Sequence, residues 1–134
     1  MFLLDSSAWI EYLRRTGSPT NVEVRRLLQE HPADVHLTEP VIMELLAGAN
    51  TPSRLDQAEK LISGLPLLAV DAFVDYRSAA AAARASRLNG HPIRSIVDCL
   101  IAAVAARTGA ALVHRDRDYD YLGEVLADLR VHTP

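Results

Sequence analysis

The chain of 134 residues contains one cysteine, Cys99, and one lysine, Lys60. A single cysteine excludes an internal disulfide and a zinc site built from several cysteines, and it fits a reducing compartment. Because Cys99 lies in an apolar segment that is predicted to be helical, we interpret it as a buried, inert thiol rather than a nucleophile. The scarcity of lysine leaves arginine as the carrier of positive charge, and arginine suits bidentate contacts with phosphate.

Membrane and export signals are also missing. No apolar run approaches the ~20 residues needed to cross a bilayer. The apolar start of the chain has no basic residue before it and meets Asp5 at once, so no signal peptide is predicted. We therefore expect a cytoplasmic protein without membrane contact. The formal net charge of -3 argues against a generic, strongly basic nucleic-acid binder, although a local arginine surface is compatible with it.

Length and composition predict one globular domain over residues 1–134. A hydrophobic share of 49% supports a packed core, and no repeat, linker or low-complexity tract divides the chain. Short apolar segments predict four to five strands, at residues 1–5, 34–37, 65–70, 110–114 and 129–132. Helices are predicted between them, at residues 8–15, 20–30, 39–48, 51–63, 71–89, 95–107 and 119–126. This alternation indicates an α/β fold, a three-layer sandwich with a mainly parallel sheet and helices on both faces.

Four carboxylates lie in or beside apolar elements that should be half buried. Asp5 follows the first strand, Glu44 and Asp98 lie in the first halves of helices, and Asp116 follows the strand at 110–114. Ligands of open parallel sheets bind beyond the carboxyl ends of the strands, so all four can point to one edge of the sheet. Clustered anions need a cation to offset their repulsion and desolvation. Mg²⁺ or Mn²⁺ held by carboxylates indicates phosphodiester hydrolysis.

Each acid also has an alternative interpretation. Asp5 could cap the following helix, although Ser6 or Ser7 is equally placed to do so. Glu44 could be an exposed helical glutamate. The sequence from Ser95 to Asp98 matches the S-x-x-D capping box. The acids after the 110–114 strand could belong to a solvated loop; they are Asp116, Asp118 and Asp120. The metal interpretation rests on the joint placement of the acids.

Four segments, in order, resemble the motifs of PIN-domain ribonucleases, and specifically the VapC toxins of bacterial toxin–antitoxin pairs. They are Met1-Phe2-Leu3-Leu4-Asp5-Ser6-Ser7-Ala8-Trp9-Ile10, Glu39-Pro40-Val41-Ile42-Met43-Glu44-Leu45-Leu46-Ala47-Gly48, Ile96-Val97-Asp98-Cys99-Leu100-Ile101-Ala102-Ala103 and Leu112-Val113-His114-Arg115-Asp116-Arg117-Asp118-Tyr119. Singly these are weak patterns, but together they are specific and span nearly the whole chain. The resemblance implies the PIN-like form of the three-layer sandwich.

The resemblance also implies roles for particular residues. Asp5, Glu44, Asp98 and Asp116 would form the acidic site, with Asp118 as a possible fifth member. Asp5 and Asp98 would be the firmest metal ligands, whereas Glu44 and Asp116 would bind a second ion, bind through water or orient the attacking water. Ser7 would support the site by hydrogen bonding. His114 and Arg115 fill a position that varies within the family and receive no catalytic role.

The implied function is that of a Mg²⁺- or Mn²⁺-dependent endoribonuclease that cuts structured RNA, such as transfer RNA or a ribosomal RNA loop. The implied partners are a cognate VapB-type antitoxin and a second copy of the chain. Two alternatives stay open: a PIN nuclease of RNA processing or quality control, and a non-catalytic dimerisation or binding module. A haloacid-dehalogenase phosphatase is disfavoured because Ser7 stands where that family needs a second aspartate.

Overall fold

The computed structural model describes residues 1–134 and is built on a four-stranded parallel sheet. The strand order is β2-β1-β3-β4. The strands are short, as their apolar segments predict: β1 Phe2–Leu4, β2 Val35–His36, β3 Ala111–Val113 and β4 Arg130–His132. Because all four run in the same direction, their carboxyl ends meet at one edge of the sheet.

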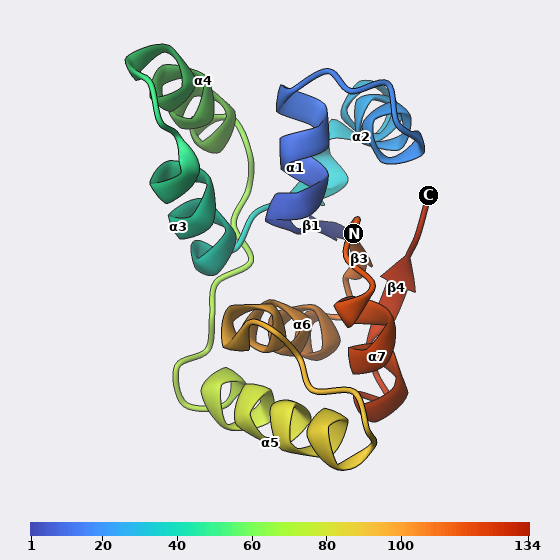
Figure 1. Ribbon diagram of the computed structural model, residues 1–134. Helices are drawn as coiled ribbons and strands as arrows, with labels where there is room; N and C mark the ends of the chain where they lie inside the picture. Colours follow the sequence, from blue (N-terminus) through green and yellow to red (C-terminus); the bar gives the residue numbers. More distant parts are fainter.

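Seven α-helices and one 3₁₀ turn surround the sheet. They are α1 Ser6–Leu13, α2 Pro19–Glu30, η1 Pro32–Asp34, α3 Glu39–Gly48, α4 Pro52–Ser63, α5 Asp75–Leu88, α6 Ile96–Thr108 and α7 Asp118–Val125. In Figure 1, α1 and α2 lie on one side of the strands, α5 and α6 on the other, and the α3–α4 pair stands to the left. This arrangement confirms the predicted α/β fold with a parallel sheet between helices. No helix is both long enough and apolar enough to cross a membrane.

A single cluster of 24 buried hydrophobic residues joins the sheet to the helices. Leu3 and Leu112 come from neighbouring strands, and Trp9 and Ile101 cover them from α1 and α6. Cys99 is also completely buried, and burial raises the pKa of its thiol to about 11. A thiol with that pKa is almost entirely protonated at neutral pH, so the prediction of an inert cysteine is confirmed.

The predicted strand at residues 65–70 is wrong. This segment forms only one isolated bridge to the chain after β2, in which Leu37 pairs with Leu67. The Leu37 N–H donates to the carbonyl of Pro66 at 2.9 Å, and the Leu68 N–H donates back to the Leu37 carbonyl at 2.7 Å. Pro66 has no N–H with which to extend the ladder. The apolar run therefore packs beside the sheet edge without becoming a fifth strand.

The long helix predicted from Asp71 begins four residues later. Residues 71–74 form a turn in which the Asp71 side chain accepts a hydrogen bond from the Phe73 N–H at 3.0 Å. Asp75 then opens α5, completely buried, and pairs with the Arg107 guanidinium of α6 through two contacts of 2.9 Å. Aspartate is common both in turns and at the start of helices, so the sequence did not show which of Asp71 and Asp75 begins the helix.

Candidate functional site

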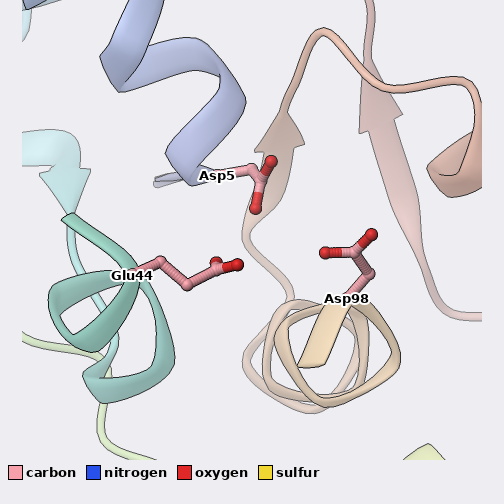
Figure 2. Close-up of side chains that lie close together, drawn as sticks. All are labelled: Asp5, Glu44 and Asp98. Carbon is pink, nitrogen blue, oxygen red and sulfur yellow. The ribbon is translucent and has the colours of Figure 1, made fainter. Parts of the chain in front are cut away.

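The acidic residues gather at the carboxyl edge of the sheet. Asp5 follows β1 and Asp116 follows β3, which is the neighbouring strand. Glu44 comes from α3 and Asp98 from the first turn of α6. Figure 2 shows the carboxylates of Asp5, Glu44 and Asp98 pointing toward one another, and one oxygen of each lies within 4.8 Å of the others. A cleft of about 350 Å³ opens over them; its lining is Asp5, Ser6, Ser7, Ile10, Glu44, Arg94, Ser95, Asp98 and Asp116.

Asp5 caps the helix and also faces the cleft. It occupies the N-cap of α1, where its Oδ2 accepts a hydrogen bond from the Ser7 N–H at 3.0 Å. The predicted cap at Ser6 or Ser7 is therefore wrong, because the carboxylate just before them takes that position. The other oxygen, Oδ1, accepts from the Tyr119 hydroxyl at 2.6 Å. Capping and site membership are thus compatible, since a carboxylate has two oxygens to share between them.

Asp98 faces the cleft and does not form a capping box. Ser95 is the N-cap of α6, but its side chain makes no cap hydrogen bond. The Asp98 carboxylate instead lies 3.3 Å from the Tyr119 hydroxyl. Burial raises the pKa of Asp98 to about 7, with further contributions from the charges of Asp5, Asp116 and Glu44. A pKa this high means that the negatively charged form of Asp98 is disfavoured in the cleft, because the site is buried and already holds other negative charges.

Glu44 is half-buried rather than an exposed helical glutamate. Its Oε1 accepts a hydrogen bond from the Ser6 hydroxyl at 3.0 Å, which fixes the long side chain across the cleft. Burial raises the pKa of Glu44, and the negative charge of Asp5 raises it further. The i+4 residue, Gly48, has open space beside it.

A second acidic group shares Asp98 with the first. Ligand oxygens of Asp98, Asp116 and Asp118 also lie within 4.8 Å of one another. Asp118 is buried, and its N–H donates to Asp116 Oδ1 at 3.0 Å. Arg94 pairs with both Asp116 and Asp118. The solvated-loop interpretation therefore fits only Asp120, whose side chain is exposed.

Ser7 and His114 fix the loop that carries Asp116. The Ser7 hydroxyl donates to Asp5 Oδ2 at 2.6 Å and accepts from the Arg115 N–H at 2.9 Å, so it links α1 to the segment after β3. His114 is buried, and its Nδ1 accepts from the Asp116 N–H at 2.9 Å. Burial lowers the pKa of His114, so the ring is neutral at neutral pH and holds the loop through this acceptor.

Three polar residues at the site were not identified from the sequence. Ser6 orients Glu44, Tyr119 bridges two acids, and Arg94 binds two others. Tyr119 follows Asp118 directly, so its proximity to the acids was a usable signal. Arg94 offered none, because it contacts residues more than 20 positions away.

The donor set fits a hard divalent ion. Every ligand atom available in both groups is a carboxylate oxygen, the type that Mg²⁺ and Mn²⁺ prefer. The acids of the first group receive hydrogen bonds only from neutral donors, namely Ser6, Ser7 and Tyr119. None of these three acids contacts a protein cation, and the negative charge of Asp5 helps to raise the pKa values of both Asp98 and Glu44.

Comparison with known proteins assigns the family. A family model of the PIN domain matches residues 2–125. The chain belongs to the PIN-domain family. Within it, the chain is 50% identical over 125 residues to ribonuclease VapC11 of Mycobacterium tuberculosis and to a VapC ribonuclease of Mycobacterium bovis, with 93% of each chain covered. It therefore belongs with the VapC ribonucleases, as the motif order indicates.

Solved structures of VapBC complexes share the fold. A DNA-bound VapBC from Salmonella typhimurium matches with a TM-score of 0.76 and 20% identity, covering 98% of this chain and 96% of the other. VapBC-1 from nontypeable Haemophilus influenzae matches with a TM-score of 0.74 and 18% identity over the same shares of the two chains. At these identities the likeness shows the PIN fold.

Tyr119→Phe tests how much the bridging hydroxyl stabilises the acids. The hydroxyl is completely buried between Asp5 and Asp98, and hydrogen bonds to charged groups contribute ~1.5–3 kcal/mol. We expect the metal-free variant to lose a free energy of unfolding of that order in urea titrations. Tyr12→Phe is the control, because the Tyr12 hydroxyl makes no hydrogen bond within the chain and should lose little. Equal losses in both variants would show that the bridge stabilises nothing.

Proposed function

We propose that this protein is a metal-dependent endoribonuclease that acts as the toxin of a toxin–antitoxin pair. The single observation that carries the proposal is the convergence of Asp5, Glu44 and Asp98 in one cleft, where none of the three carboxylates contacts a protein cation. Membership of the VapC ribonucleases supports it, because half of the aligned residues are identical across nearly the whole chain. The same proposal places the protein in the cytoplasm, where transfer and ribosomal RNA are found.

The proposed metal ligands are Asp5, Asp98 and Glu44, which would hold Mg²⁺ or Mn²⁺. When bound, such an ion supplies positive charge for the phosphate oxygens and lowers the pKa of a water that it binds. The neighbouring side chains of the protein hold these ligands in place. Tyr119 and Ser7 hold the two oxygens of Asp5, and Ser6 holds Glu44. Ser7 thus has a supporting rather than a catalytic role.

Asp116 and Asp118 complete the acidic cleft on the other side of Asp98. Asp116 is less buried than Asp118, with side-chain exposures of 23% and 5%. We assign Asp116 to the orientation of the attacking water and Asp118 to support, because Asp118 is turned into the protein and bound to Arg94. The site contains no serine or cysteine paired with a histidine, so a water is the proposed nucleophile.

An anionic, partly desolvated cleft is also a receptor for a guanidinium or ammonium group. We therefore propose that the antitoxin is a VapB-type protein that inserts an arginine or lysine among the carboxylates. A homodimer is proposed from the family resemblance. Structured RNA, either transfer RNA or a ribosomal RNA loop, is the proposed substrate class. Action in RNA processing is the alternative, and it differs in predicting that expression without a partner is harmless.

Expression in a bacterial host, with and without intact acids, tests the proposal. We expect the wild-type chain to arrest growth and the purified protein to cleave RNA in Mg²⁺ or Mn²⁺ but not in EDTA. Asp5→Asn should permit growth and abolish cleavage. Arg26→Gln is the control, because Arg26 pairs with Glu23 and Glu30 on the surface of α2, and it should behave as wild type. Harmless accumulation of the wild-type chain, or cleavage that persists in EDTA, would contradict the proposal.

A further inference from the structure

Arg94 binds two of the five acids at the same time. It lies in the segment between α5 and α6, and its Nε donates to Asp118 Oδ2 at 3.1 Å. Its Nη2 donates to Asp116 Oδ1 at 2.9 Å, and its backbone N–H adds a contact of 3.3 Å to Asp118 Oδ2. A single guanidinium therefore spans two carboxylates at the edge of the cleft.

The two acidic groups consequently differ in how their charge is offset. The group of Asp5, Glu44 and Asp98 receives only neutral hydroxyl and amide donors. In the group of Asp98, Asp116 and Asp118, two of the three carboxylates already contact a positive charge. The two groups share Asp98, so they would otherwise form adjacent cation positions.

A guanidinium is well suited to the position between Asp116 and Asp118. It stays charged at every physiological pH, and its planar fork matches carboxylate oxygens. Asp116 Oδ1 already accepts from both Arg94 and the Asp118 N–H, which leaves it fewer lone pairs for a metal. A divalent ion beside Asp118 would also lie within a few ångströms of the guanidinium, and like charges at that separation repel.

We propose that Arg94 is the resident cation of the Asp116–Asp118 side, so that the cleft takes one divalent ion, among Asp5, Glu44 and Asp98. This inference rests on the proposed metal-dependent function and adds the number of ions to it. Arg94 is a positioning residue in this arrangement: it orders Asp116 and Asp118 as a second metal ion would. Its side chain is 70% exposed, and its Nη1 makes no hydrogen bond within the chain.

Counting bound Mn²⁺ tests this inference. Equilibrium dialysis and titration calorimetry on the metal-free wild-type protein should give one ion per chain. Arg94→Gln should give two, because the vacated carboxylates regain an unpaired negative charge. Two ions in adjacent sites lie ~3.5–4 Å apart, so the Mn²⁺ electron paramagnetic resonance spectrum of the variant should show magnetic coupling that the wild type lacks.

Companion variants locate the second ion. Arg94→Lys keeps the positive charge and should still give one ion. Arg94→Gln combined with Asp118→Asn should return the count from two to one. Arg26→Gln removes an equally well-paired surface guanidinium on α2 and should leave the count at one. Because the Arg94 side chain is exposed, we expect its variants to keep the fold, which circular dichroism checks.

The possible results separate this inference from the function on which it rests. Two coupled ions in the wild type, or one ion in both the wild type and Arg94→Gln, would overturn the role of Arg94 while leaving a metal-dependent nuclease intact. A wild-type protein that binds no Mn²⁺ would overturn both.

Discussion

Asp98→Asn is expected to abolish RNA cleavage while leaving the metal-free protein at least as stable as the wild type. Asparagine has nearly the same shape as aspartate but carries no charge. The change removes one of three anionic ligands, and we expect cleavage to fall by at least ~100-fold, because changing a residue that only orients a metal ligand already costs ~10–100-fold. Stability should move in the other direction, because the negative charges that raise the pKa of Asp98 no longer face a fourth anion.

The two effects are measured separately. Cleavage of RNA is followed in Mg²⁺ and in Mn²⁺, and the free energy of unfolding is measured in urea without metal. Added metal should raise the melting temperature of the wild type through binding linkage but not that of the variant. Asp56→Asn is the matched control, because Asp56 is an exposed aspartate of α4 paired with Lys60. A variant at Asp98 that cleaves at near the wild-type rate would remove Asp98 from the ligand set.

The sequence alone could not decide whether an acid caps a helix, faces the cleft or does both. Asp5 fits both roles, because one oxygen caps α1 and the other meets Tyr119. The S-x-x-D pattern at Ser95 pointed to a capping box that does not form. Such patterns describe only a few neighbouring residues, whereas the direction of the Asp98 side chain is set by how α6 packs beside β3 and α7.

Chain order and the carboxyl-end rule were enough to predict where the acids gather. Parallel strands place Asp5 and Asp116 at one edge of the sheet whatever the details of packing. Arg94 escaped prediction because its partners are distant in sequence: it lies 22 positions from Asp116 and 24 from Asp118. The error at residues 65–70 has a local cause, since Pro66 limits pairing at a sheet edge.

The proposed site also predicts that metal affinity depends on pH. Folding raises the pKa of Asp98 from 3.8 to about 7, and it raises the pKa of Glu44 as well. Below about pH 7 the metal must therefore displace a proton from Asp98. We expect the apparent affinity for Mn²⁺ to fall about tenfold for each pH unit below 7, which is the result of displacing one proton. Calorimetric titrations between about pH 5 and pH 8 would measure this slope.

The same shift has a defined sign for stability without metal. An acid whose pKa rises on folding binds more protons in the folded state, so its contribution is complete below about pH 4 and is lost as the pH rises through about 7. Buried His114 acts in the opposite sense, because its lowered pKa makes the folded protein lose stability as the pH falls. The total pH profile combines these two contributions with that of Glu44, whose pKa also rises on folding.

The difference between wild type and Asp98→Asn isolates the aspartate. Both proteins contain His114 and Glu44, so subtracting the two free energies of unfolding at each pH removes most of what these two groups contribute. We expect the wild type to become less stable relative to the variant as the pH rises from about 4 to about 8. In the variant, the steep pH dependence of Mn²⁺ binding should weaken together with the binding itself. A difference that stays constant over this range would mean that Asp98 titrates in the folded protein as it does in the unfolded chain. The cleft would then lack the crowding of charge on which the proposed metal site depends.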